Sequence, residues 1–597
     1  MKFIVSFTLS LYKSIHVRIK LLCKNLGVIM FANFLMGCAE QLTEQGNAEA
    51  QENVPSVTTA QPSTPVKTSP TQQEEYIYKI LVAEIAGQRG QYTLATQYFL
   101  DIAEKTRDPR FAERATRVAL YSQKDALALQ AAQLWVTLYP KNASARQVLT
   151  GVLLRQNRVD DAVPHFEEML NIIGDNTNQR SEAVSSLLEP LKDQNNALKL
   201  LEKVLPKRQT DSVMLIIYAR LLIGANQLDR AGEVLQQLLK MEPEHEQGVL
   251  LYAHVLDKQD KTAQALQWLQ PLLNKKPDKQ EWRFLYAQLL ASNQQFVNAI
   301  QQFQQLLAKN PQNEEFLYAL GVLSIQVEQP KAAKRYFTDL LKNSEQSDVA
   351  RYHLGQVAEM EKQLDEALSW YNKVNMGASY LNAQARIAVI LDKQGFLDKA
   401  LEHLRTVSVS DSEDAVALVQ LEAELLVDHK RYADAMTVYD AALAKHPKNV
   451  DLLYMRAMLA EKMNRLEQLE QDLRQVLTIE PQNVQALNAL GYTLADRTNR
   501  YQEAYDLVKK ALELHPEDHY ILDSMGWVSY RLGKNQEAIE YLRKAQAKKD
   551  DPEIAAHLGE VLWVNGNQQE AKAIWKKAQE IFPNDEQLRT TVKRFLP

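Results

Sequence analysis

The sequence LYALGVLSIQVEQPKAAKRYF, at residues 317–337, contains one full copy of a pattern that predicts how this chain folds. The small residue Gly321 is followed twelve positions later by Ala333, and the bulky Phe337 comes four positions after that alanine. Two antiparallel helices joined by a short turn would bring Gly321 and Ala333 face to face. Small side chains at such a contact allow the helix axes to approach toward the lower end of the usual range of about 8–10 Å.

The alanine of this pattern recurs along almost the whole chain of 597 residues. Successive copies are 33 to 35 residues apart, the mean spacing is 34.0 residues, and one copy has leucine in place of alanine. A fixed period of this kind predicts a stack of similar supersecondary units. The fifteen positions are Ala95, Ala128, Ala162, Ala197, Ala231, Ala265, Ala299, Ala333, Ala367, Ala400, Ala435, Leu469, Ala504, Ala538 and Ala571.

A second series of small residues precedes the first by twelve positions, or by thirteen in one copy. Its members are Ala83, Thr116, Thr150, Ser185, Ala219, Ala253, Ala287, Gly321, Gly355, Ala388, Ala423, Ala457, Gly491, Gly526 and Gly559. We predict that helices pack closely where the two series meet. The pairs assigned to this packing are Ala219 with Ala231, Ala253 with Ala265, Ala287 with Ala299, Gly321 with Ala333, Gly355 with Ala367, Gly526 with Ala538, and Gly559 with Ala571.

Bulky residues and prolines keep the same period. A large side chain follows the alanine by four positions in many copies and would fill the space between neighbouring helix pairs, as at Phe303 and Tyr371. A proline twelve positions after the alanine would end the second helix, because proline cannot continue a helix interior. Beyond the last of these prolines, Pro583, residues Glu586 to Phe595 are predicted to form a final helix that covers the end of the stack.

The composition is usual for a soluble folded protein and excludes several classes of function. Hydrophobic residues make up 46% and charged residues 24%, and the scarcity of glycine (19) and proline (20) favours long helices over many short strands. The formal net charge of −6 leaves no basic excess, so nucleic acid is not an expected partner. The two cysteines, Cys23 and Cys38, allow neither a disulfide framework nor a Cys/His zinc pattern.

Residues 1–37 are predicted to be an export signal. An apolar run at residues 26–35 is too short to span a bilayer but suits a signal peptide. The run ends in LMGC at residues 35–38, which resembles the bacterial lipobox, whose cysteine accepts diacylglycerol. The resemblance implies cleavage before Cys38 and a lipid on that cysteine. Because Ala39 stands where an aspartate would favour the inner membrane, it also implies the outer membrane, facing the periplasm.

Residues 38–73 are predicted to be a disordered tether. The run AQPSTPVKTSP at residues 60–70 is typical of this segment, which has too few apolar residues to bury a core and several prolines that oppose helix. Such a tether would hold the folded body, residues 74–597, away from the lipid. The alternative is an ordinary disordered terminus without an anchor.

No motif for catalysis or for binding a metal or cofactor fits. The sequence HEQGV at residues 245–249 lacks the second histidine of a zincin motif, and residues 526–534 have the wrong spacing for a phosphate-binding loop. The eleven histidines are scattered over different repeats, where a lone histidine is more often a surface or packing residue than a catalyst. We therefore expect a protein that is not an enzyme and has no cofactor or metal.

The 34-residue helix–turn–helix period resembles the tetratricopeptide repeat (TPR). The resemblance covers residues 76–585, approximately, and is weakest near Ala128, Ala197 and Leu469. It implies an all-α solenoid of about 15 repeats, wound into a right-handed superhelix and stabilised by stacking of neighbours. It also implies a concave groove that would bind peptides, helices or larger protein elements.

Three C-terminal stretches carry a further resemblance. They are NALGYTLADR at residues 488–497, ILDSMGW at 521–527 and AAHLGEVLW at 555–563. These stretches are similar to a family of large proteobacterial TPR lipoproteins, which includes the lipoprotein that binds the periplasmic carboxyl-terminal processing protease. The resemblance implies an adaptor that docks and activates this serine protease and delivers peptidoglycan hydrolases for degradation.

Two other functions remain open from the sequence. One is a structural or assembly scaffold for an envelope machine, such as polysaccharide export, secretion or a pilus. The other is a cytoplasmic TPR adaptor with an unused leader. Both would use the same repeat array, because a repeat fold indicates how a protein works and seldom what it binds.

Overall fold

The computed structural model describes residues 72–596 except 123, 190, 192–193, 344–346 and 410. The chain divides into two compact units, one up to residue 343 and the other from residue 344. The described residues form 31 α-helices and one short 3₁₀ helix, η1 (Leu205–Lys207), and they contain no β-strand. The prediction of an all-α array of about fifteen helix pairs is confirmed.

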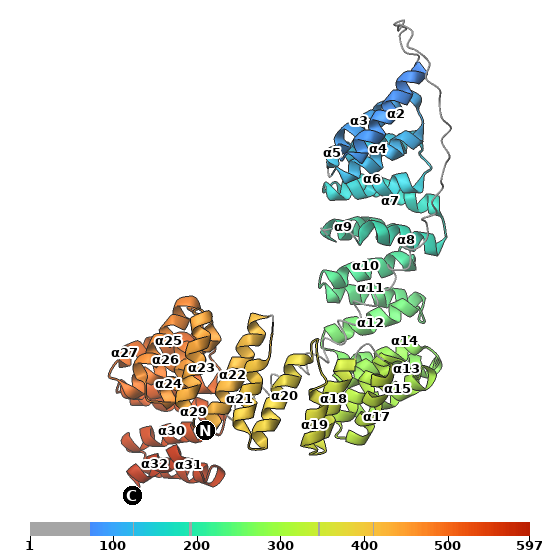
Figure 1. Cartoon of the computed structure of the whole chain (residues 1–597). Helices are drawn as coiled ribbons and strands as arrows, with labels where there is room; N and C mark the ends of the chain where they lie inside the picture. The colour runs from blue at the N-terminus through green and yellow to red at the C-terminus, as the bar shows by residue number, and fades with distance from the viewer. Residues whose placement is uncertain are drawn as a thin grey trace, which may run out of the picture. The chain divides into compact units, whose positions relative to one another are not determined.

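The first unit contains eight consecutive helix pairs (Figure 1). Its helices are α2 (Gln72–Gln88), α3 (Tyr92–Thr106), α4 (Pro109–Tyr121), α5 (Asp125–Leu138), α6 (Ala143–Arg155), α7 (Val159–Ile173), α8 (Thr177–Leu188), α9 (Gln194–Val204), α10 (Ser212–Gly224), α11 (Leu228–Met241), α12 (Glu246–Lys258), α13 (Thr262–Lys275), α14 (Gln280–Ser292), α15 (Phe296–Lys309), α16 (Glu314–Gln326) and α17 (Pro330–Asn343).

The second unit contains seven helix pairs and a single last helix. Its helices are α18 (Ser347–Met360), α19 (Leu364–Tyr371), α20 (Tyr380–Lys393), α21 (Leu397–Thr406), α22 (Ser412–Asp428), α23 (Tyr432–Lys445), α24 (Val450–Lys462), α25 (Leu466–Ile479), α26 (Val484–Arg497), α27 (Tyr501–Leu514), α28 (His519–Arg531), α29 (Asn535–Lys548), α30 (Pro552–Val564), α31 (Gln568–Ile581) and α32 (Glu586–Phe595). The last helix has the bounds predicted from the sequence.

Local sequence explains where the helices of a pair begin and end. Many first helices follow an Asn or Asp whose side chain accepts a hydrogen bond from the first turn, as Asn313 does from the Phe316 N–H and Asn449 from the Leu452 N–H. Such caps satisfy backbone donors that the helix itself leaves free. The turn inside a pair commonly contains a residue at positive φ, which favours glycine and asparagine, such as Gly533 and Asn226.

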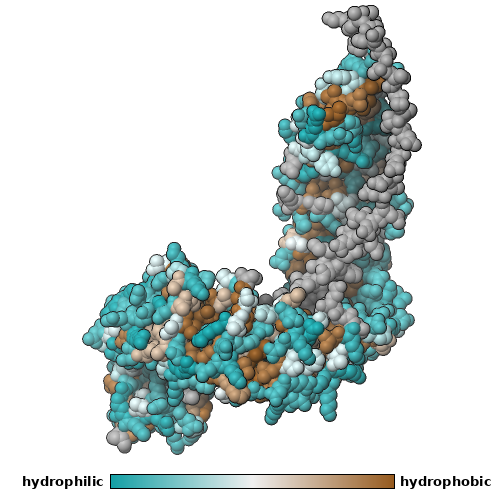
Figure 2. All heavy atoms as spheres, in the orientation of Figure 1, coloured by the Kyte–Doolittle hydropathy of each residue, from teal (hydrophilic) through white to brown (hydrophobic). Residues whose placement is uncertain are grey.

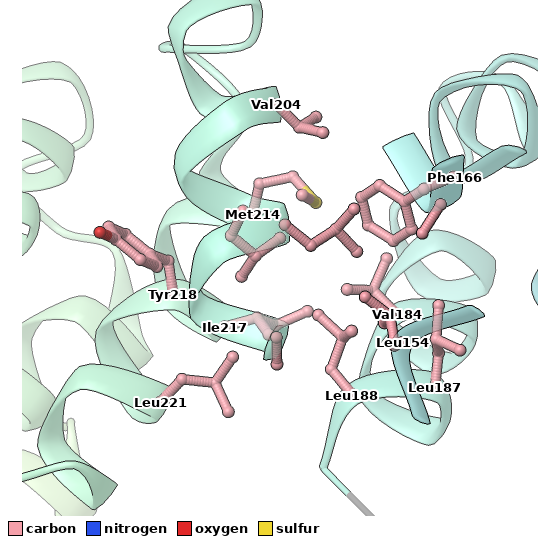
Figure 3. Packing of buried hydrophobic residues seen from close by; sticks show 14 of the residues in the cluster. Leu154, Phe166, Val184, Leu187, Leu188, Val204, Met214, Ile217, Tyr218 and Leu221 are labelled. Atoms are coloured by element: carbon pink, nitrogen blue, oxygen red, sulfur yellow. The ribbon is translucent and has the colours of Figure 1, made fainter. Parts of the chain in front are cut away.

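The hydrophobic core runs along the stack and has no single centre. Figure 3 shows a section of it in the first unit, where side chains of successive helices point toward one another. Phe166 of α7 is fully buried, and Leu154 of α6, Leu188 of α8 and Met214 of α10 belong to the same cluster. Each repeat therefore buries its apolar side chains against its neighbours, as expected for a solenoid.

The fourth repeat departs from the regular pairing. In the other repeats the two helices of a pair pack along each other, whereas α8 contacts mainly α6 and α10, and α9 contacts mainly α7 and α10. Ser185 is accordingly only partly buried. This repeat includes one of the weakest copies of the sequence pattern.

The two ends of the array are covered differently. At the C-terminal end, Phe595 of α32 stacks on Trp575, with ring centroids 5.7 Å apart, and closes the core there. At the other end, α2 leaves an apolar stripe exposed, and Figure 2 shows brown side chains at that end of the first unit. The stripe consists of Ile77, Tyr78, Leu81 and Ile85, which are 47–62% exposed.

Candidate functional site

The alanines assigned to repeat packing lie in the interior of the array. All of them are fully buried: Ala219, Ala231, Ala253, Ala265, Ala287, Ala299, Ala333, Ala367, Ala538 and Ala571. The two helices of each of these pairs contact each other, for example α10 with α11 and α28 with α29.

The four glycines of the same assignment sit against large side chains. A Cβ atom on Gly321 would come within 2.5 Å of the Phe337 ring, and one on Gly355 within 2.5 Å of the Tyr371 ring. A Cβ on Gly526 would come within 2.5 Å of Leu542, and one on Gly559 within 2.0 Å of Trp575. The space that would hold a side chain at these positions is therefore already filled by the second helix of the pair.

Other positions singled out in the sequence have simple roles or lie outside the described residues. Cys38, the export signal and residues 38–71 of the tether are among the residues that the structure does not describe. His245 caps α12, since its Nδ1 atom accepts a hydrogen bond from the Gly248 N–H. Within the described residues, no group of three or more His, Cys, Asp or Glu side chains is placed to hold a metal ion.

A set of polar residues that sequence reasoning missed lies on one side of the first helices in the second unit. We call this side the inner face and define it by Glu424 on α22, Glu461 on α24, Tyr492 on α26, Asp523 and Trp527 on α28, and Glu553 and His557 on α30. Relative to the small residue of each helix, these positions fall within a sector of about 120° on a helical wheel. Neighbouring first helices contact each other here, as α26 does with α28 and α28 with α30.

A chain of hydrogen bonds crosses three of these helices. His557 Nδ1 lies 3.0 Å from both carboxylate oxygens of Asp523. The Tyr492 hydroxyl donates to Glu553 Oε1 at 3.0 Å and lies 3.5 Å from His557 Nε2. The Trp527 ring stacks on the imidazole, with centroids 4.3 Å apart. Because Tyr492 on α26 reaches across α28 to Glu553 on α30, the first helices converge on this side, and the inner face is concave there.

Burial and charge decide the ionisation of this cluster. Burial strongly opposes protonation of His557, but the adjacent Asp523 carboxylate outweighs it and raises the pKa of His557 to about 9. Burial also raises the pKa of Glu553, with a further contribution from the charge of Asp523. At neutral pH His557 is therefore an imidazolium, and its Nδ1–H donates a hydrogen bond to the Asp523 carboxylate.

Raising the pH is expected to destabilise the C-terminal repeats. Unfolding returns the pKa of His557 from about 9 to its ordinary 6.5, so the stability that protonated His557 contributes is complete below pH 6.5 and is lost as the pH rises through 9. Between pH about 7.5 and about 9.5, the free energy of unfolding should fall by about 2 kcal/mol. Urea unfolding followed by circular dichroism measures this change.

The matched control is the His557→Phe variant, which removes the titrating group. Its free energy of unfolding should change less over the same pH range. The control would still lose some stability as the pH rises, because the pKa of Glu553 is also raised in the folded state, and a raised carboxyl pKa favours the folded state at lower pH. An equal decrease in both proteins would show that other groups cause the effect.

The imidazole of His557 is enclosed within the cluster. The imidazole is covered by the Trp527 ring and is only 5% exposed, and its two nitrogens face Asp523 and Tyr492. No serine or cysteine side chain is bonded to it within the described part of the chain.

None of the helices between residues 72 and 596 that the structure describes is both long and apolar enough to cross a membrane.

Comparison with known proteins identifies the same repeat in several segments between residues 222 and 594. A family model described as the tetratricopeptide repeat matches residues 222–289 and 530–594. A second model with that description matches residues 318–375, 385–450, 420–468 and 454–519. A TPR repeat-containing protein of Pseudomonas aeruginosa is 40% identical over 488 residues, which cover 82% of this chain and 82% of that protein.

Two solved structures of TPR proteins show some similarity to the chain. A tetratricopeptide repeat protein from Parabacteroides merdae is 18% identical, with a TM-score of 0.34, and covers 42% of this chain and 98% of its own. A TPR protein of Thermus thermophilus is 25% identical, with a TM-score of 0.27, and covers 29% of this chain and 96% of its own.

Proposed function

Because this chain belongs to the tetratricopeptide repeat family, we propose that it is a non-catalytic scaffold that binds other proteins along the first helices of its repeats. The concave inner face of the second unit supports this role, since it carries polar and charged side chains on several successive first helices. The described residues contain no further domain that could carry a separate activity.

The finer proposal is an adaptor at the outer membrane, anchored by a lipid on Cys38 and facing the periplasm. It would dock and activate the carboxyl-terminal processing protease and bring peptidoglycan hydrolases to it. One observation carries this proposal: the three stretches that resemble the proteobacterial lipoproteins, residues 488–497, 521–527 and 555–563, lie within α26, α28 and α30. The resemblance therefore falls on the helices that form the inner face and not on the outer helices of the same repeats.

The direct test is affinity capture of the tagged full-length chain from detergent-solubilised membranes, with the bound proteins identified by mass spectrometry. The proposal expects a periplasmic processing protease among them. Recovery of components of a polysaccharide export, secretion or pilus machine without such a protease would favour the alternative of an assembly scaffold.

Replacing Cys38 by alanine is expected to abolish lipid attachment. The sulfur of Cys38 is the acceptor in a lipobox, and alanine offers no nucleophile in its place. Metabolic labelling with a radioactive fatty acid should mark the natural chain and not the Cys38→Ala variant. A matched Cys23→Ala change should leave the label in place, because residue 23 would be removed with the signal. A natural chain without label would instead favour the cytoplasmic adaptor.

A further inference from the structure

We infer that the inner face of the second unit binds a lysine- or arginine-rich segment of a partner protein. This inference rests on the proposed scaffold function and names the chemistry of the segment that the scaffold takes.

Five buried polar atoms on the first helices of the second unit have no hydrogen-bond partner among the described residues, and three of them fall within the sector of the inner face. These three are Glu424 Oε1 on α22, Asn488 Oδ1 on α26 and Trp527 Nε1 on α28. The other two, His519 Nε2 and Ser529 Oγ on α28, lie outside that sector. Trp527 is only 7% exposed, and its ring lies against His557 within the hydrogen-bonded cluster. A buried polar atom without a partner costs free energy. The two acceptors and one donor of the inner face are themselves buried, so a bound chain reaches them only when their side chains rotate outward.

Two carboxylates of the inner face, Glu424 and Glu461, make no ion pair within the described part of the second unit, whereas Asp523 is paired with His557. Two carboxylates on the second helices are paired instead. Glu470 Oε1 lies 2.8 Å from Arg500 Nη1, and Glu503 Oε1 lies 2.5 Å from Arg474 Nη2. These outer carboxylates are thus already paired, whereas Glu424 and Glu461 are open to a cation from outside.

The pKa values of Glu424 and Glu461 are both raised, as expected for carboxylates without a bound cation. Burial, together with the charge of Asp428, raises the pKa of Glu424 to about 7. Burial likewise raises the pKa of Glu461. The charge of Glu553, three repeats away along the chain, adds to this effect, and the charges of Arg497 and Lys462 partly oppose it. An ammonium or guanidinium group placed between these side chains would reverse both shifts.

The charged residues of the sequence are divided unevenly between the two units. Residues 344–597 contain 40 Asp and Glu against 31 Lys and Arg, whereas residues 1–343 contain 35 against 38. The negative excess therefore belongs to the unit that carries the inner face. The two unpaired carboxylates lie on successive first helices, Glu424 on α22 and Glu461 on α24, which favours a segment with at least two positive charges over a single ion as the occupant.

The inference is tested with fluorescein-labelled peptides on the purified full-length chain. One peptide alternates lysine and alanine, and the other carries glutamate in place of each lysine. Fluorescence anisotropy should show saturable binding of the lysine peptide, one per chain, and no binding of the glutamate peptide. The double variant Glu424→Gln/Glu461→Gln should weaken the lysine peptide about tenfold, since each lost charge pair contributes modestly.

The matched control is Glu470→Gln/Glu503→Gln, which removes the same number of charges from the second helices. It should change the dissociation constant less than about twofold. Equal weakening by the two double variants would mean that the peptide senses only net charge, and equal binding of both peptides would also overturn the inference. If the inner-face variant still captures its natural partner from membranes, the scaffold function stands and the cationic segment does not.

Discussion

Replacing Asp523 by leucine is expected to lower the free energy of local unfolding of the last repeats by about 3 kcal/mol. Asp523 is buried, and its carboxylate oxygens lie 3.0 Å from His557 Nδ1. Without this carboxylate, the imidazole either keeps a buried charge that has lost its nearest counterion or gives up its proton. Both outcomes are costly, since a buried polar group then lacks its partner. Hydrogen exchange of peptides from α28 and α30 measures the local free energy.

The control for this prediction replaces both members of the pair. The double variant Asp523→Leu/His557→Phe should recover most of the lost stability, because well-packed apolar residues often substitute for a buried ion pair at little cost. If the double variant were as unstable as Asp523→Leu, the loss would come from packing and not from the unpartnered imidazole.

Replacing Gly559 by alanine is expected to destabilise the last two repeats by about 2 kcal/mol, despite the better helix propensity of alanine. The new methyl group would come within 2.0 Å of Trp575 Nε1. Trp575 cannot easily move away, because it is 1% exposed and its ring stacks on both Trp563 and Phe595. The substitution therefore forces α30 and α31 apart and disturbs the packing of α32. Hydrogen exchange of α30 and α31 should show the loss.

Gly232→Ala is the matched control, since it adds the same methyl group to another buried helical glycine. There the methyl would lie 3.7 Å from Val255, an ordinary van der Waals contact. This variant should gain up to about 1 kcal/mol, the helix propensity difference between the two residues. A loss of stability at Gly559 and a gain at Gly232 would support close packing of α30 on α31. A gain of stability at both glycines would contradict it.

The close packing at Gly559 and the ion pair of His557 with Asp523 both involve α30. Together they explain how the array can present a defined surface. Gly559 brings α30 close to α31 on one side, and His557 ties it to α28 on the other. Apolar stacking alone tolerates small shifts of one helix along another, whereas a hydrogen-bonded network has one preferred arrangement. We expect the inner face to be well ordered before a partner arrives, which reduces the entropy cost of binding.

The repeat architecture could be predicted from the sequence because its signals are local or strictly periodic. The small residues, the prolines and the last helix from Glu586 to Phe595 all follow from a 34-residue count and from the properties of single side chains. The loose pairing of α8 with α9 could not be predicted in detail, although the pattern is weakest there. That pairing depends on contacts with α6, α7 and α10, which no count along one helix describes.

The arrangement as a stack of helix pairs follows from the residue pattern alone, since close packing at each pair requires small residues at a fixed spacing. Which polar residues act together depends on the folded chain. Tyr492 and Glu553 are 61 residues apart in the chain, and Asp523 and His557 are 34 apart, yet each pair is joined by a hydrogen bond of 3.0 Å. The curvature of the stack brings them together, and curvature accumulates from small rotations between many repeats, which no single repeat of the sequence specifies.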